Sequence, residues 1–245
     1  MTRKFVLLFQ GRTGSSFLRQ ALDSQDAIVM EGEVPGIIRR DAGLAKPEDA
    51  SPERLTELHE AQRAWTLEHF EKARPPEIKA VGFKTKLYDL GNPKAYAQLL
   101  REQNAAIIHN TRRNMVKLTV SQLNSQVLQK QVGRLNRLEG DPDVPPLEVS
   151  TEKFLKLLYR MTSLQQELGA YVESLGLPTI KVRYEDVFGG PDRVLGDICD
   201  FLGVERSDYT VRVRKVTKDN LREALSNYDE LKQAVAGTEF EAMFT

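Results

Sequence analysis

Residues Leu7–Leu22, with the sequence LLFQGRTGSSFLRQAL, carry the clearest structural signal in this chain. A run of apolar residues ends at the turn Gly11–Ser16, and an amphipathic helical pattern follows directly. A strand, a glycine-containing loop and a helix in this order are typical of a phosphate site, because the first N–H groups of a helix and its positive dipole end face the loop. The loop lacks the lysine of the usual nucleoside-triphosphate loop, which argues against an ATPase or a GTPase.

The residue types in this loop suit a phosphate or a sulfate. Gly11 and Gly14 can adopt conformations that let backbone N–H groups converge on one point. Ser15 and Ser16 offer hydroxyl donors, and Arg12 offers a charged, forked donor. The plainer alternative is a tight turn in which Ser15 or Ser16 caps the helix.

Apolar strand patterns alternate with helical patterns along the rest of the chain. The expected strands are KFVLLFQ (4–10), AIVMEGEVPG (27–36), which runs into a Gly/Pro loop, EIKAVGFKTKLYD (77–89), NAAIIHNTRR (104–113) and PTIKVRYED (178–186). This alternation predicts an α/β fold in three layers, with a parallel sheet flanked by helices. Ligands bind beyond the carboxyl ends of such strands. Those ends carry Gly11–Ser16, Glu31–Gly36, Lys84–Lys86, Asn110–Arg113 and Arg183–Asp186.

Length and composition are those of one α/β domain, residues 1–245, or of one domain with a small appendage. Lysine plus arginine equals aspartate plus glutamate at 35 each, so no basic excess argues for nucleic acid or an anionic membrane. The one cysteine, Cys199, excludes an internal disulfide and is expected to be a buried thiol. Every apolar run is shorter than the ~18 residues that a membrane span needs, and the N-terminal run is too short for a signal peptide. We expect a cytoplasmic protein.

A second anion site is suggested by IIHNTRRNMVKLTVSQL (107–123). Arg113 ends a strand and Ser121 lies inside the helix that follows, so the two side chains can hold one phosphate together. The alternative is an ordinary helix start with surface arginines and an unremarkable serine.

The two motifs together resemble those of the P-loop sulfotransferases, closest to the bacterial or carbohydrate-type branch. FQGRTGSSFL (9–18) is similar to that branch's Arg-Ser/Thr-Gly-Ser/Thr-Ser/Thr loop, and RNMVKLTVS (113–121) to its Arg-Asn-Pro-x-Asp-x-x-x-Ser motif. Met115 and Lys117 replace the usual Pro and Asp of that motif. IKVRYEDVFGGPDRVLGDICDFLGV (180–204) and NYDELKQAVAGTEFEAMF (227–244) are similar to later blocks of the family.

The resemblance implies a donor, a reaction and a set of binding residues. The donor is 3'-phosphoadenosine 5'-phosphosulfate (PAPS), the product is adenosine 3',5'-bisphosphate (PAP), and no metal is needed. Arg113 and Ser121 would bind the 3'-phosphate, and Lys215 would close over the nucleotide. The residues implied for the 5'-phosphosulfate are Arg12, Thr13, Gly14, Ser15 and Ser16. A P-loop small-molecule or nucleotide kinase that uses ATP-Mg, and a non-catalytic nucleotide-binding protein, remain as alternatives.

Sulfuryl transfer needs a base for the acceptor hydroxyl and cations near the sulfuryl oxygens. The resemblance points to a glutamate after the second strand, and the Gly-Glu-x-Pro context favours Glu33 over Glu31. Lys84 and Lys86 share a strand face; Lys84 is the candidate that, with Arg12, stabilises the departing phosphate. The three histidines are expected to be structural or solvated, since none ends a strand: His59, His69 and His109.

The expected acceptor is a small molecule, a carbohydrate or a lipid, and a carbohydrate or glycolipid hydroxyl is favoured. Segments 40–75 and 125–165 match the family least and are the expected acceptor-side helices and loop. The acidic, proline-rich stretch 139–150 is expected to be a loop, with a role as a lid left open. The amphipathic helix expected at 151–176 suits either a homodimer face or a core face.

Overall fold

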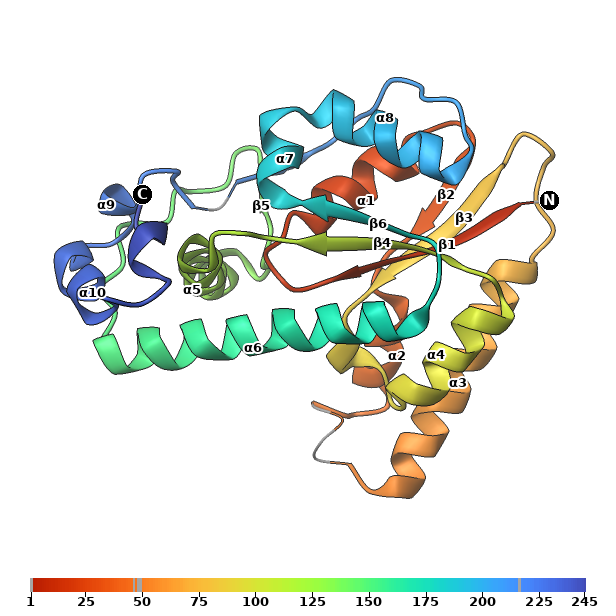
Figure 1. Ribbon diagram of the computed structural model, residues 1–245, viewed down its shortest axis with the longest axis horizontal. Coiled ribbons are helices and arrows are strands. Elements are labelled where there is room, and N and C mark those ends of the chain that lie inside the picture. Colours follow the sequence, from red (N-terminus) through yellow and green to blue (C-terminus); the bar gives the residue numbers. More distant parts are fainter. Residues whose placement is uncertain (1, 46, 48–49, 216) are drawn as a thin grey trace. The chain divides into compact units, whose positions relative to one another are not determined.

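The structure is a computed structural model that describes residues 2–45, 47, 50–215 and 217–245 (Figure 1). Its chain divides into two compact units. The first unit contains Met1–Thr111 and Leu168–Val211, and the second contains Arg112–Glu167 and Arg212–Thr245. Three of the residues outside this description, 46, 48 and 49, fall within segment 40–75.

The first unit is built on a five-stranded parallel sheet with the strand order β2-β3-β1-β4-β6. The strands are β1 (Arg3–Phe9), β2 (Ile28–Glu31), β3 (Ala80–Thr85), β4 (Ala106–Thr111) and β6 (Thr179–Arg183). The chain first fills the sheet on one side of β1 with β2 and β3, and then crosses to the other side with β4 and β6. A reversal of this kind opens a crevice beyond the carboxyl ends of the central strands.

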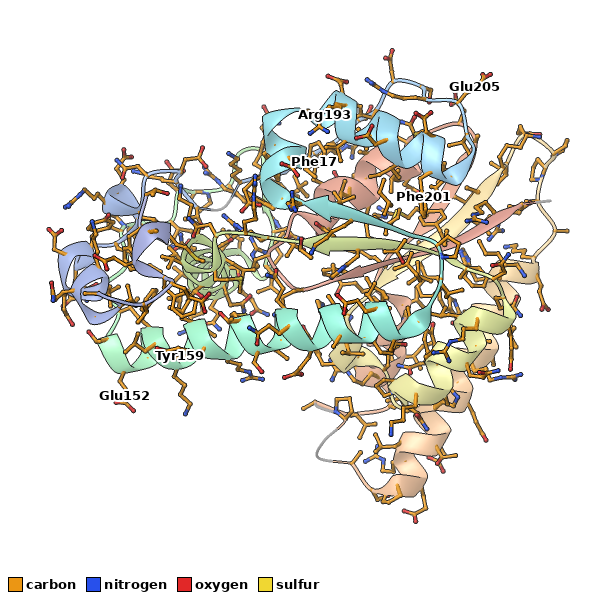
Figure 2. The ribbon with its side chains drawn as sticks, in the orientation of Figure 1. Phe17, Glu152, Tyr159, Arg193, Phe201 and Glu205 are labelled. Atoms are coloured by element: carbon orange, nitrogen blue, oxygen red, sulfur yellow. The ribbon has the colours of Figure 1, made fainter. Side chains whose placement is uncertain are left out.

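Successive residues of β1 point to opposite faces of the sheet, because strand side chains alternate. Phe5, Leu7 and Phe9 join the core formed with α1 (Ser15–Asp23), α7 (Tyr184–Gly189) and α8 (Pro191–Leu202). Val6 and Leu8 join the core formed with α3 (Pro52–Glu71), α4 (Pro93–Glu102) and the end of α6 (Thr151–Leu175). Figure 1 shows these helices on the two sides of the sheet, and Figure 2 shows Phe17 on α1 and Phe201 on α8 on the same side. The expected α/β fold with a helix-flanked parallel sheet is confirmed.

The prediction of a Gly/Pro loop after the second strand is wrong in part. The helix α2 (Val34–Asp41) begins there, with Pro35 in its first turn. Proline suits this position because its fixed φ fits a helix and its missing N–H needs no partner. Glu33 is the residue at the N-terminal boundary of α2, and its side chain does not cap the helix.

Strand β3 leads into the short helix η2 (Leu87–Asp89), which the sequence pattern did not predict. Helices α3 and α4 then begin at side-chain caps, as helix starts with Ser and Asn are expected to do. Ser51 accepts a hydrogen bond from the N–H of Arg54, and Asn92 accepts one from the N–H of Ala95. Each helix has a proline in its first turn.

The second unit consists mostly of helices around its own apolar core. Its elements are α5 (Met115–Val132), the first part of α6, α9 (Leu221–Ala224), α10 (Tyr228–Ala234) and η3 (Glu241–Met243). A short antiparallel pair, β5 (Arg137–Leu138) with β7 (Val213–Arg214), was not expected from the sequence. Residues 139–150 lie outside any helix, which agrees with the expected loop.

Three further expectations concern single features. Cys199 is a free, buried thiol in the first unit, as expected. Within the part of the chain that the structure describes, no helix combines the length and the apolar character needed to cross a membrane. The extent of one domain over residues 1–245 and the cytoplasmic location stay predictions.

Candidate active site

The loop between β1 and α1 has two left-handed residues, Arg12 at φ 70° and Gly14 at φ 79°. Left-handed residues inside a turn bring successive N–H groups to one side and create a concave site for an anion. Gly14 is also the N-terminal boundary residue of α1, and no side chain caps the helix there. Gly14, and not Ser15 or Ser16, therefore occupies the cap position, and both serines lie inside the first turn of the helix.

Two hydrogen bonds fix the base of the loop. The hydroxyl of Thr13 donates to the carbonyl of Gln10 at 2.6 Å, and the side-chain amide of Asn110 donates to the carbonyl of Thr13 at 3.0 Å. Thr13 is fully buried, and its hydroxyl is committed to the hydrogen bond with Gln10. Ser15 is buried and Ser16 is half-buried at the start of α1.

Helix α7 packs closely against the loop. A Cβ atom built on Gly14 would lie 3.2 Å from ring atoms of both Tyr184 and Phe188. These two rings contact each other at a centroid distance of 4.5 Å, and Phe188 also meets Phe17 of α1 at 5.3 Å. The block that begins at residue 180 thus contributes two aromatic walls beside the loop.

Glu33 lies between two lysines from the end of β3. Lys84 Nζ is 3.1 Å from Glu33 Oε1 and 3.2 Å from the hydroxyl oxygen of Ser16. Lys86 forms an ion pair with Glu33 Oε2. Lys84 thereby joins the candidate base to the first turn of α1, a contact that the sequence motifs did not predict.

Burial and charge act in opposite directions on these groups. Burial acts to raise the pKa of the Glu33 carboxyl, but the charges of Lys84 and Lys86 outweigh it and hold that pKa below its ordinary value. Burial lowers the pKa of Lys84, and the attraction of Glu33 opposes this only in part. Burial also acts to lower the pKa of Lys86, yet Glu33, Tyr88 and Asp89 outweigh it and raise that pKa.

Glu31 occupies a different environment from Glu33. It ends β2 and lines a cavity of about 240 Å³. The lining residues are Glu31, Val34, Trp65, Glu68, His69 and Lys72. Glu31 and Val34 flank Glu33 in the sequence, and four of the others come from α3 or the residue after it.

The three histidines have structural surroundings. The ring of His69 stacks on Trp65 at 5.2 Å, its Nε2 lies 3.1 Å from the carbonyl oxygen of Gly82, and Arg74 lies 3.2 Å from its Nδ1. Burial, with the nearby charge of Arg74 second, lowers the pKa of His69. His59 lies in α3 and His109 lies inside β4, where burial lowers its pKa to about 4.

The residues expected to hold the 3'-phosphate belong to the second unit. Arg113 is exposed and precedes α5, and Ser121 lies buried within α5. Both neighbours of Arg113 are held in place: the backbone of Arg112 exchanges two 3.0 Å hydrogen bonds with Gln165, and the Asn114 amide donates to the carbonyl of Met243 at 2.8 Å. These hydrogen bonds fix the backbone on both sides of Arg113, from which its side chain projects.

Lys215, the third basic residue named from the sequence, is exposed in the second unit. Its Nζ lies 2.9 Å from Asp219 Oδ1. Among the described residues, no group of three or more His, Cys, Asp or Glu side chains is arranged to hold a metal ion.

Sequence reasoning missed three residues that shape this site: Asn110, Asp89 and Arg39. Asn110 lies near the carboxyl end of β4, where ligand-binding residues are expected, so its position was a usable signal. Asp89 and Arg39 carried no such signal, because their pairing joins residues that are 50 positions apart.

The model of the sulfotransferase family matches residues 5–208, which is most of the chain. The protein therefore belongs to the sulfotransferase family and is a sulfotransferase enzyme, for which the family implies PAPS as the donor. No curated protein matches the chain.

Solved structures share the fold at low sequence identity. A sulfotransferase from Alicyclobacillus acidocaldarius has 17% identity and a TM-score of 0.52, with 100% of this chain and 96% of that chain covered. The sulfotransferase domain from the curacin biosynthetic pathway has 16% identity and a TM-score of 0.54, with 92% and 83% covered. At these identities the likeness concerns the fold alone.

Proposed function

We propose that this sulfotransferase moves the sulfuryl group of PAPS to a hydroxyl group of an acceptor and releases PAP. The observation that carries the proposal is the contact of Lys84 with both Glu33 and Ser16. One cation thus lies between a carboxylate that can accept a proton and the first turn of an anion-binding helix. In this proposal the sulfuryl group lies beside this cation during the transfer.

The donor is proposed to bind through both of its phosphate ends. The 5'-phosphosulfate lies on the N–H groups of the loop Arg12–Ser16, with the Arg12 guanidinium and the Ser16 hydroxyl as further donors. Arg113 and Ser121 hold the 3'-phosphate, and Lys215 closes over the nucleotide after leaving Asp219. The resemblance of both motifs to those of the family supports the roles of the loop, of Arg113 and of Ser121, and the role of Lys215 rests on the family resemblance outside these motifs.

The chemical step is a displacement at sulfur. The acceptor oxygen forms a bond to sulfur while the bond from sulfur to the phosphate oxygen breaks, and the acceptor proton passes to Glu33. Negative charge builds up on the leaving phosphate oxygen, where Arg12, Lys84 and the loop N–H groups stabilise it. When Lys84 turns toward that charge, it no longer holds Glu33 Oε1, and the carboxylate becomes a stronger base.

The acceptor is proposed to be a carbohydrate or glycolipid hydroxyl. The cavity lined by Glu31 and Val34, which flank Glu33 in the sequence, supports this choice. The half-buried Trp65 offers it an aromatic wall, and Glu31 and Glu68 offer acceptors for hydroxyl groups. Flat apolar rings with a polar rim suit the faces and hydroxyl groups of sugars. A homodimer and a lid role for residues 139–150 stay predictions.

The first experiment is isothermal titration of the full chain with PAP, with ATP-Mg as the comparison. We expect tight binding of PAP that does not change when a chelator is added. Binding of ATP-Mg without binding of PAP would overturn the proposal and favour a P-loop kinase.

The second experiment measures turnover with PAPS and a panel of carbohydrate, lipid and phenolic acceptors. Glu33→Gln removes the base but keeps the size of the side chain, so turnover should fall by ~100-fold or more while PAP affinity is retained. Full turnover in Glu33→Gln would contradict the assignment of Glu33 as the base and favour Glu31. Trp65→Ala should raise the acceptor KM and leave PAP affinity unchanged. Tyr209→Ala, a half-buried aromatic that packs on the other core of the first unit, is the matched control.

A further inference from the structure

A buried carboxylate, Asp89, lies directly behind the pair formed by Glu33 and Lys86. Asp89 is only 1% exposed and ends the short helix η2. Its Oδ1 accepts hydrogen bonds from Arg39 Nε at 3.2 Å and from Arg39 Nη2 at 3.1 Å. Its Oδ2 has no hydrogen bond among the described residues and lies 3.8 Å from Lys86 Nζ. Lys86 therefore stands between two carboxylates, one buried and one facing the site.

Arg39 connects this carboxylate to the helix that follows Glu33. It lies in α2 and is itself buried. Its remaining guanidinium nitrogen donates to the carbonyls of Leu44 and Ala45, so the side chain has little freedom to move. Because Glu33 is the N-terminal boundary residue of α2, the pairing of Arg39 with Asp89 fixes the helix from which Glu33 projects.

The backbone of α2 also approaches Asp89 closely. A Cβ atom built on Gly36 would lie 2.8 Å from Asp89 Oδ2, so glycine is needed there for the carboxylate to keep its place. Gln62 of α3 reinforces the contact by donating to the carbonyls of Pro35 at 2.9 Å and Asp89 at 2.7 Å. The two backbone segments that carry Glu33 and Lys86 are thus held together by groups that solvent does not reach.

We propose that Asp89 is a positioning residue for Glu33 and acts through Lys86 and Arg39. It holds Lys86 on Glu33 Oε2, which leaves Oε1, the oxygen toward Lys84 and Ser16, as the atom that takes the acceptor proton. The inference rests on the proposed role of Glu33 as the base. The two lysines therefore have different roles. Lys84 stabilises the charge that develops during the transfer, and Lys86 fixes the orientation of the Glu33 carboxylate.

The charges around Glu33 determine the direction in which its pKa changes when Asp89 or Lys86 is lost. Arg39, Lys86 and Lys84 bring three positive charges to a partly buried place, and Asp89 balances part of that charge. Without Asp89, Glu33 feels the full attraction of Lys86, its pKa falls further, and it becomes a weaker base. Without Lys86, Glu33 loses one of its two cations and its pKa rises.

The test uses Asp89→Asn and Lys86→Met in the full chain, with kcat/KM for the acceptor measured against pH. For Asp89→Asn we expect kcat/KM for the acceptor to fall by roughly tenfold or more. The acid limb of its pH profile should move to lower pH, and PAP affinity should stay unchanged. For Lys86→Met we expect the acid limb to move to higher pH. In the double variant the Asp89 change should add little, because residues that act through one partner are not additive. The control is Asp192→Asn, which makes the same change from carboxylate to carboxamide at an exposed position.

Each outcome separates the two proposals. Full turnover in Glu33→Gln overturns the base assignment and this inference with it. Loss of turnover in Glu33→Gln, with acid limbs that do not move in Asp89→Asn and Lys86→Met, overturns the positioning role alone. If Asp89→Asn does not fold, Gly36→Ala takes its place, because the added Cβ displaces the same carboxylate without removing a charge. It should then lower kcat and leave PAP affinity unchanged; an unchanged kcat would contradict the inference.

Discussion

The side-chain amide of Asn110 donates a 3.0 Å hydrogen bond to the backbone carbonyl of Thr13, across 97 positions of sequence. Strands β1 and β4 are neighbours, with Phe9 opposite Asn110, so this bond ties the end of β4 to the loop that follows β1. Asn110 is fully buried, and the loop conformation that gathers N–H groups depends on where the Thr13 peptide points.

Asn110→Leu should loosen the anion-binding loop. The change leaves the Thr13 carbonyl buried without its partner, which costs about 1–3 kcal/mol of folding free energy. PAP affinity should fall as well, because the N–H groups of the loop lose their fixed direction. Chemical denaturation measures the first effect and isothermal titration the second. Wild-type PAP affinity in a destabilised Asn110→Leu protein would show that the bond serves the fold and not the loop.

Gly14→Ala and Gly11→Ala form a matched pair within the loop. Gly14 has a φ of 79° and its added methyl group would meet the rings of Tyr184 and Phe188 at 3.2 Å. Alanine in the left-handed region costs about 1–2 kcal/mol before any crowding. Gly11 lacks a positive φ, and a Cβ there meets nothing within 4 Å.

We therefore expect Gly14→Ala to lower the melting temperature and to weaken PAP binding, while Gly11→Ala changes the melting temperature little. Thermal denaturation with and without PAP checks both effects. Equal behaviour of the two variants would contradict the role assigned to the left-handed conformation of Gly14.

Arg113→Glu should weaken PAP binding by ~100-fold or more, because it replaces a charge-assisted contact to a phosphate with repulsion. Ser121→Ala should have a smaller effect in the same direction, since a hydroxyl contributes a neutral donor. Arg193→Glu reverses a charge on the exposed surface of α8 and should leave PAP affinity unchanged (Figure 2). If Arg113→Glu binds PAP as the wild type does, the 3'-phosphate site lies elsewhere.

His109 should make the stability of the protein depend on pH. Burial first, and the nearby charge of Lys181 second, lowers its pKa from 6.5 to about 4 in the folded state. Between these values the unfolded chain binds a proton that the folded chain does not, so stability falls as the pH drops from 6.5 toward 4. The whole change amounts to roughly 3 kcal/mol.

His109→Leu should remove this part of the pH dependence, since leucine does not titrate and Nε2 of His109 has no hydrogen bond among the described residues to lose. Urea denaturation at pH 7 and at pH 5 measures the difference for both proteins. The prediction fails if the two proteins lose the same free energy of unfolding over that range.

The sequence pattern predicted the strands of the sheet because parallel strands are buried on both faces and read as short apolar runs. It predicted the loop at Gly11–Ser16 because glycine marks the positions that need a left-handed backbone or close approach. It did not predict α2, because a helix of 8 residues with a proline in its first turn resembles a Gly/Pro loop. It also did not predict the β5–β7 pair, since strands of 2 residues carry no periodic signal.

The sequence by itself determined the fold class, the turn between the first strand and the first helix, and the family motifs, because each depends on residues close together along the chain. Only the tertiary structure decided that Glu33 meets Lys84 and Lys86 while Glu31 lines a separate cavity. It alone placed Asp89 behind Lys86 and Asn110 beneath the loop. These contacts depend on strand order and register, which bring together charges and amides from distant segments, and no local pattern encodes them.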